Sequence, residues 1–159
     1  MMITTRFSRL IVLAALIFTV LPGVTRAARE GTSPALPSIT DIRVSFKLDP
    51  RLTQGLYMGD RWVSPPTYSA VREGKEVTVE ARAQGLVGKG KPTNIRPDWI
   101  PSDPEMVAVT PGQGKEVKIT VRRAGQSSLK VASHGYSKEL YIKATYEGNA
   151  IHVEISRKP

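Results

Sequence analysis

The chain has 159 residues, with 23 Lys and Arg against 14 Asp and Glu, two His and no Cys. The absence of Cys excludes disulfide bonds and a lipid-anchored lipoprotein. The formal charge of +9 favours anionic partners, such as envelope polymers, extracellular nucleic acid or acidic protein surfaces, although the commoner interpretation is simply a soluble, charged surface.

Residues 1–27 have the pattern of a secretory signal peptide. Two Arg precede the apolar run 10–21, Pro22-Gly23 breaks that run, and Thr25-Arg26-Ala27 predicts cleavage after Ala27. An uncleaved anchor is the alternative, but twelve residues are fewer than the roughly 20 that a spanning helix needs. Cleavage removes three Arg and no acid, which leaves a formal charge of +6. We expect export across the inner membrane to the periplasm, the cell surface or the exterior.

An alternating strand pattern begins after a short leader. Residues 28–38 combine Pro, Gly, Ser and Thr and predict a flexible segment. From residue 39 to residue 48 apolar and polar residues alternate, which predicts a strand with one buried face. Residues 49–66 break the alternation with Gly and Pro but keep large apolar side chains. We therefore predict one domain, residues 39–159, with an insertion at 49–66.

The rest of the chain predicts an all-β fold. Short runs rich in β-branched residues recur between clusters of Gly, Pro, Asn and Asp. About eight short strands are expected, among them 76–84, 116–121 and 127–133, whereas 85–97 is expected to be a loop. Nothing after residue 27 has the composition of an amphipathic helix. This pattern is typical of a β-sandwich.

The predicted core centres on Trp99, just before a turn rich in Ser, Asp and Pro. Ala81 and Ala83 on the preceding strand are small, so a bulky side chain must fill the space opposite them, and Trp99 is the candidate. The other predicted core residues are inward positions of the following strands: Val107, Val109, Ile119, Leu129 and Val131.

Several motifs in this part of the chain follow one another in the order found in a known domain family. They are Trp99, Ser102-Asp103-Pro104-Glu105, Val107-Ala108-Val109, the glycines 112 and 114, and the segment 125–131. These residues resemble the bacterial immunoglobulin-like group 2 domain, of the intimin and invasin type, over roughly residues 39–146. The resemblance implies an immunoglobulin-like β-sandwich of about seven or eight strands, as in adhesin stalks, surface-layer parts and accessory modules of secreted enzymes. The insertion and the strand after residue 146 depart from the family.

The sequence contains no recognisable reaction chemistry. His134 and His152 have no second His or Cys at ligand spacing, and Asp98, Asp103 and Glu105 lack the spacing of a calcium loop. No Gly-x-Ser-x-Gly elbow occurs. The segment 85–91 has glycines and lysines but lacks the Gly-Lys-Ser/Thr ending of a phosphate-binding loop. We predict a protein that is not an enzyme and has no metal, cofactor or nucleotide.

The first candidate surface is a basic end. In an immunoglobulin-like order the loops 85–97 and 134–137 share one end of the sandwich. No acid lies between Glu80 and Asp98 or between Glu116 and Glu139. The cations of these two stretches are Arg82, Lys89, Lys91 and Arg96, with Lys118, Arg122, Arg123, Lys130 and Lys138. The candidate partner-binding residues are Lys89, Lys91, Arg96, Tyr136 and Lys138, and the plainer interpretation is that they are solvated.

A second candidate surface is an aromatic face formed by Tyr57, Trp62 and Tyr68, which could stack on sugars. Alternatively, apolar residues of the insertion cover an open sheet edge. The sequence thus predicts a secreted, non-catalytic bacterial binding module with an adhesive, structural or accessory role. Its expected partner is an envelope or extracellular protein or an anionic polymer, and the alternative is a carbohydrate-binding module.

Overall fold

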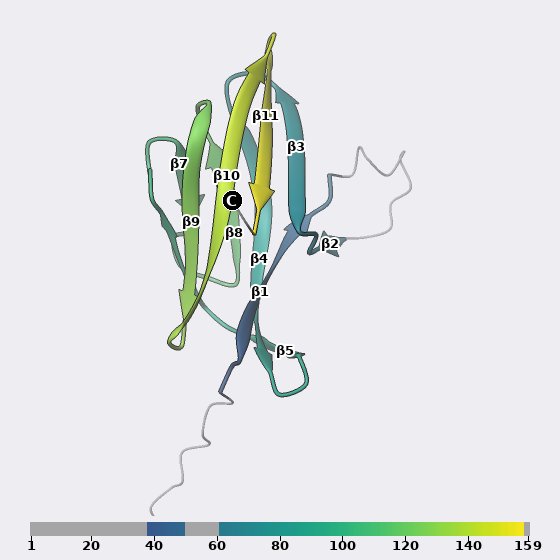
Figure 1. Cartoon of the computed structure of the whole chain (residues 1–159), viewed down its shortest axis with the longest axis vertical. Helices are drawn as coiled ribbons and strands as arrows, with labels where there is room; N and C mark the ends of the chain where they lie inside the picture. The colour runs from purple at the N-terminus through teal and green to yellow at the C-terminus, as the bar shows by residue number, and fades with distance from the viewer. Residues whose placement is uncertain (1–37, 50–60, 158–159) are drawn as a thin grey trace, which may run out of the picture. The chain divides into compact units, whose positions relative to one another are not determined.

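The structure is a computed structural model that describes residues 38–49 and 61–157. The predicted signal peptide, nearly all of the predicted leader and most of the insertion, Tyr57 included, lie outside these residues. The described chain contains eleven strands and no helix (Figure 1): β1 (Asp41–Lys47), β2 (Trp62–Val63), β3 (Thr67–Glu73), β4 (Val77–Val87), β5 (Lys91–Asn94), β6 (Asp98–Pro101), β7 (Val107–Thr110), β8 (Glu116–Val121), β9 (Gly125–Ser133), β10 (Tyr136–Glu147) and β11 (Ala150–Ser156).

The strands form two antiparallel sheets. One sheet has the order β2-β1-β4-β8-β7, and β5 also pairs with β4. The other sheet has the order β3-β11-β10-β9-β6. Strand β8 pairs with the first half of β4, from Val77 to Arg82, and β5 pairs with the second half, from Gln84 to Val87. The long strand β4 therefore has two successive partners on the same side.

The core lies between the two sheets, and both contribute to it. Along β4, β8 and β11 buried residues alternate with exposed or partly exposed ones, as expected for strands with one face on a core and one toward water. The buried cluster includes Val44 and Ile119 from one sheet and Leu129, Leu140 and Ile155 from the other. The predicted all-β sandwich is confirmed at this level.

Trp99 is buried in the core and is bonded to a turn that links the two sheets. Its side chain is 2 % exposed, and its indole Nε1–H donates to the carbonyl of Gly114 at 3.0 Å. The next carbonyl, that of Lys115, accepts from the backbone N–H of Ala83 on β4 at 2.8 Å. The β7–β8 turn thus joins the Trp99 strand of one sheet to β4 of the other.

The other predicted core residues follow the same pattern, with one exception. Val107, Ile119, Leu129 and Val131 are buried, but Val109 is only partly buried and packs against the core. Its strand, β7, is the edge of its sheet, so it has a neighbouring strand on only one side.

Two strands were not anticipated from the sequence. Residues 85–97 were expected to be a loop, but β4 continues to Val87 and β5 pairs with it as a hairpin. Trp62 and Val63, in the predicted insertion, pair with Lys47 and Phe46 as the edge strand β2. The described end of the insertion thus covers the free edge of β1, as one of the two sequence interpretations proposed.

The β6–β7 turn is held by the carboxylate of Asp103. Its Oδ1 accepts from the backbone N–H groups of Glu105 and Met106 at 3.0 Å each, and its Oδ2 accepts from Arg123 at 2.7 Å. The bond from Met106, the bond and charge of Arg123 and the bond from Glu105 outweigh desolvation and lower the pKa of Asp103 below its usual 3.8. Ionised Asp103 therefore stabilises the folded state.

We expect this stabilisation to depend on pH in the acid range. Because the folded pKa is lower than the unfolded pKa, the contribution is complete above about 3.8 and is lost as the pH falls through the folded pKa. The Asp103→Asn variant keeps one acceptor oxygen but cannot ionise. Thermal midpoints of both proteins, measured from neutral pH down to about pH 2, should differ most at neutral pH and converge in acid. A difference that is constant with pH would contradict the assigned role of the charge.

Candidate functional site

The β4–β5 hairpin carries two of the predicted partner-binding residues. Lys89 lies in its turn between Gly88 and Gly90, whose positive φ angles of 51° and 82° suit glycine, and Lys91 pairs with Val87 at its tip. Both lysines are exposed. The hairpin forms because β4 extends past the reach of β8, and β5 satisfies the backbone groups that β8 leaves. Pro92 is tolerated in β5 because a strand with one neighbour needs fewer donors.

The base of this hairpin is tightly packed. Gly85 pairs with Thr93, and a Cβ atom placed on Gly85 would lie 2.6 Å from the Cγ2 of Ile39 and 2.9 Å from that of Ile95. On the other side of β4, the backbone N–H of Thr40 donates to the carbonyl of Leu86 at 2.6 Å. The hairpin base is therefore part of the core, whereas its tip is in solvent.

The β9–β10 turn lies at the same end of the sandwich as this hairpin (Figure 1). The link between them is an ion pair across the two sheets, in which the Nζ of Lys138 on β10 lies 3.0 Å from the Oδ2 of Asp41 on β1. Asp41 pairs in turn with Leu86 on β4. Burial raises the pKa of Asp41, but the hydrogen bonds from Lys138 and the Ile42 N–H and the charges of Lys138 and Arg157 leave it lowered.

Asp41 changes the electrostatics that the sequence predicted for this end. The acid-free stretches in the sequence are real, but Asp41 lies 97 residues from Lys138 and meets it only through the fold. Lys138 is therefore engaged in an ion pair and is a poor candidate for contact with a partner. Tyr136 is 44 % exposed, but it lines a shallow depression of about 340 Å³ that also contains Asp98 and Lys130.

Several other cations lie elsewhere. Arg122 and Arg123 lie just before the start of β9, whereas the β9–β10 turn follows the other end of this strand. The two ends of a nine-residue strand are roughly 26 Å apart. Lys130 is directly opposite Glu139 on the outer face of its sheet, and Lys118 is opposite Glu80. The expectation that these cations gather at one end is wrong for Arg122 and Arg123, because successive turns of an antiparallel sheet alternate between its two ends. Lys130 does line the depression beside Tyr136, but Glu139 lies opposite it.

What remains at the hairpin end is a smaller cluster, which we call the hairpin cations: Lys89, Lys91 and Arg96. All three are exposed, and none forms an ion pair with any acid among the described residues. Arg96 lies just past β5, two residues after Asn94, which pairs with Gln84. The segment from residue 81 to residue 97 contains no acid, and the nearest acid of the neighbouring strand, Asp41, is paired with Lys138.

Of the predicted aromatic face, the structure describes Trp62 and Tyr68, and Tyr68 is not available on the surface. Tyr68 is only 9 % exposed, its ring stacks on Phe46 with centroids 4.6 Å apart, and its hydroxyl donates to the carbonyl of Lys47. Burial, with the nearby charge of Asp49, raises its pKa. The ring of Trp62 is half-buried, and the guanidinium carbon of Arg82 lies 4.5 Å from its centroid. The prediction of a sugar-stacking role for Tyr68 is wrong, because this ring is part of the core.

The described residues offer no other recognised chemistry. They contain no group of three or more His, Asp or Glu side chains placed to hold a metal ion. No helix long and apolar enough to cross a membrane occurs among them. Comparison with known proteins finds no matching family model, no similar curated protein and no similar solved structure. The fold therefore defines the class, a two-sheet all-β protein, and the resemblance to immunoglobulin-like group 2 domains stays a prediction.

Proposed function

We propose that this protein is a secreted, non-catalytic, immunoglobulin-like binding module of the bacterial envelope or exterior, and that it holds an anionic partner at the tip of the β4–β5 hairpin. The observation that carries this proposal is the exposure of Lys89 and Lys91 at the tip of a hairpin without acidic residues, with exposed Arg96 just past the end of β5. The motif around Trp99 supports the family, and the signal-like first 27 residues support the destination.

The hairpin suits an extended anionic partner better than the rest of the surface does. On the sheet faces Lys47 and Lys118 both lie beside Glu80, and Lys130 lies opposite Glu139. These two acids reduce the field of the three lysines. The three hairpin cations instead present like charges that attract carboxylate or phosphate groups from a distance, which mainly raises association rate and selectivity. The partner we propose is an anionic envelope polymer or an acidic protein surface.

The Lys89→Glu/Lys91→Glu variant should fold normally and bind its partner at least about tenfold more weakly. Both side chains are exposed, so the effect should be confined to binding, and salt should reduce wild-type binding in the same way. The measurement is a cross-linked pull-down of tagged mature protein from its native envelope, analysed for proteins and polysaccharides.

A variant of equal charge provides the control. Lys75→Glu/Arg122→Glu changes two exposed cations at the other end of the sandwich and alters the net charge by the same amount. We expect it to keep most of the binding. Equal losses in both variants would show that only net charge matters, and unchanged binding in the hairpin variant would refute this site.

A further inference from the structure

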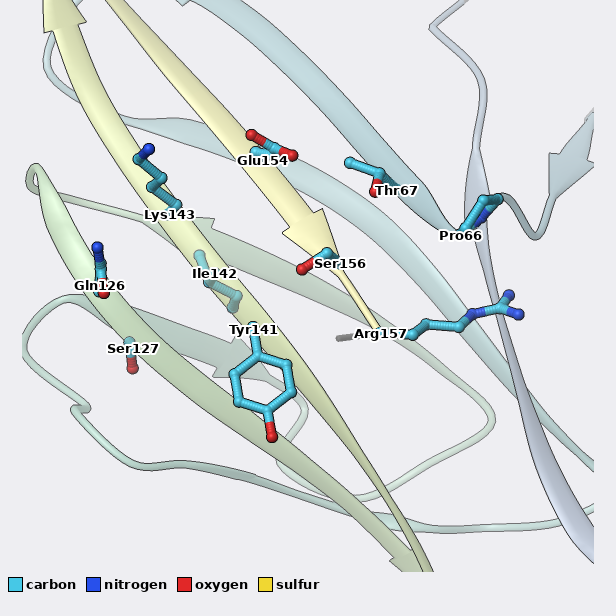
Figure 2. Close-up of a pocket in the computed structure, with 10 residues that line it drawn as sticks. All are labelled: Pro66, Thr67, Gln126, Ser127, Tyr141, Ile142, Lys143, Glu154, Ser156 and Arg157. Atoms are coloured by element: carbon cyan, nitrogen blue, oxygen red, sulfur yellow. The ribbon is translucent and has the colours of Figure 1, made fainter. Parts of the chain in front are cut away.

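The outer face of the five-stranded sheet carries a groove of about 750 Å³ (Figure 2). It lies among the outward side chains of β3, β9, β10 and β11, a different surface from the hairpin tip. This volume is in the range of small-ligand sites, about 300–1,000 Å³. The side chains that give it its chemistry are Thr67, Gln126, Tyr141, Lys143, Glu154 and Ser156.

Strand register arranges these side chains in two rows. In the first row, Tyr141 lies between Ser128 on β9 and Ser156 on β11. In the second row, Lys143 lies between Gln126 and Glu154. Since directly opposite residues of antiparallel strands have Cβ atoms about 5 Å apart, the side chains of each row are neighbours on the outer face of the sheet. One aromatic ring is thus bordered by hydroxyl, amide and charged groups.

The two rows of the groove carry one positive and one negative side chain. Lys143 is directly opposite Glu154, so an arriving ligand meets no net charge from this pair. Arg157 also borders the groove, but Figure 2 shows its side chain extending away from the two rows, and it donates to the carbonyls of Val44 and Ser64 at 3.3 and 3.0 Å. The guanidinium is therefore held at the border of the groove, where its positive charge points away from the two rows.

Tyr141 is held in place by its neighbour. Its hydroxyl donates to Glu139 at 3.2 Å, and the charge of this carboxylate, with some desolvation, raises the pKa of Tyr141. The phenol stays neutral at physiological pH, and its ring remains partly exposed beside the groove (Figure 2). A tyrosine ring has few rotatable side-chain bonds, so it can pack against an apolar face of a ligand at low entropic cost.

We propose that this groove binds a neutral oligosaccharide, with the Tyr141 ring packed against a face of sugar C–H groups and with Gln126, Lys143 and Glu154 bonded to sugar hydroxyls. Sugar rings have this combination of apolar faces and many donors and acceptors, which matches the ring and side-chain stems together with the polar ends. An anionic ligand would gain no net attraction from the opposed Lys143 and Glu154, and an apolar ligand would leave the polar ends without water or a partner. The site is independent of the hairpin cations.

The test is a titration of the isotope-labelled protein, expressed as the full chain and purified after secretion, with cellohexaose, xylohexaose, maltohexaose and chitohexaose. At least one should shift the backbone amide signals of β9, β10 and β11. Tyr141→Ala should weaken that binding about tenfold, whereas Tyr141→Phe, which keeps the ring, should retain it. Thermal midpoints of both variants confirm folding.

The outcomes separate this proposal from that for the hairpin. Binding in the groove should be insensitive to salt and intact in Lys89→Glu/Lys91→Glu. The proposal is overturned if none of the four sugars shifts these signals, if the shifts map only to the hairpin, or if folded Tyr141→Ala binds as well as the wild type.

Discussion

Replacing Trp99 with Ala is expected to lower the free energy of unfolding by about 3–5 kcal/mol. The side chain is 2 % exposed, so its removal leaves a large cavity between the sheets. The carbonyl of Gly114 also loses the indole donor at 3.0 Å, and a partly buried acceptor without this partner adds to the cost. Because the same turn bonds β4 through Lys115, the damage should extend to both sheets.

Chemical denaturation followed by circular dichroism measures this effect without depending on the lost fluorophore. The matched control is Ile100→Ala, one residue further along β6, whose side chain is 53 % exposed; it should change stability by less than about 0.5 kcal/mol. Trp99→Phe keeps most of the volume and loses the N–H donor, so its cost should fall between the two. A Trp99→Ala protein as stable as the wild type would refute both the central position of this residue and the family alignment built on it.

Local patterns in the sequence were sufficient for most of the fold. Alternating β-branched residues predicted the buried faces of β4, β8 and β11, and the turn-forming residues after Trp99 predicted the β6–β7 turn. Strand β5 could not be predicted in this way, since Lys91-Pro92-Thr93-Asn94 has little intrinsic strand preference. Strand β5 forms because β4 extends beyond the end of β8, so the backbone groups of its second half need another partner. That requirement is a property of the assembled sheet.

The candidate surfaces depended even more on contacts distant in sequence. A basic end was predicted by reading acid-free stretches, but Asp41 enters it from β1 and neutralises Lys138. Tyr68 was grouped with Tyr57 and Trp62 because they are near one another in the chain, yet Phe46 on β1 stacks on Tyr68 in the core. The groove around Tyr141 was missed because its residues come from four strands. The only local signal was the outward position of polar residues on β10 and β11.

The second large effect is expected at Gly85, in the base of the hairpin. Gly85→Ala should destabilise the protein by about 1–3 kcal/mol, because the added methyl group would lie 2.6 Å from the Cγ2 of Ile39 and 2.9 Å from that of Ile95. Both Ile residues are buried, so neither can move into solvent to relieve the overlap. The usual gain from replacing Gly with Ala, about 0.4–1 kcal/mol from the unfolded state, is too small to offset this strain.

Gly112→Ala is the matched control, because no atom lies within 4 Å of a Cβ at this position. Denaturation curves should show it as stable as the wild type or slightly more stable. If Gly85→Ala is also neutral, the hairpin base is loosely packed and cannot hold Lys89 and Lys91 in a fixed position. If it is destabilised as expected, its binding to the anionic partner becomes informative. A folded variant with weakened binding would show that the core holds the hairpin in its binding geometry, whereas unchanged binding would show that the charge of the tip is sufficient.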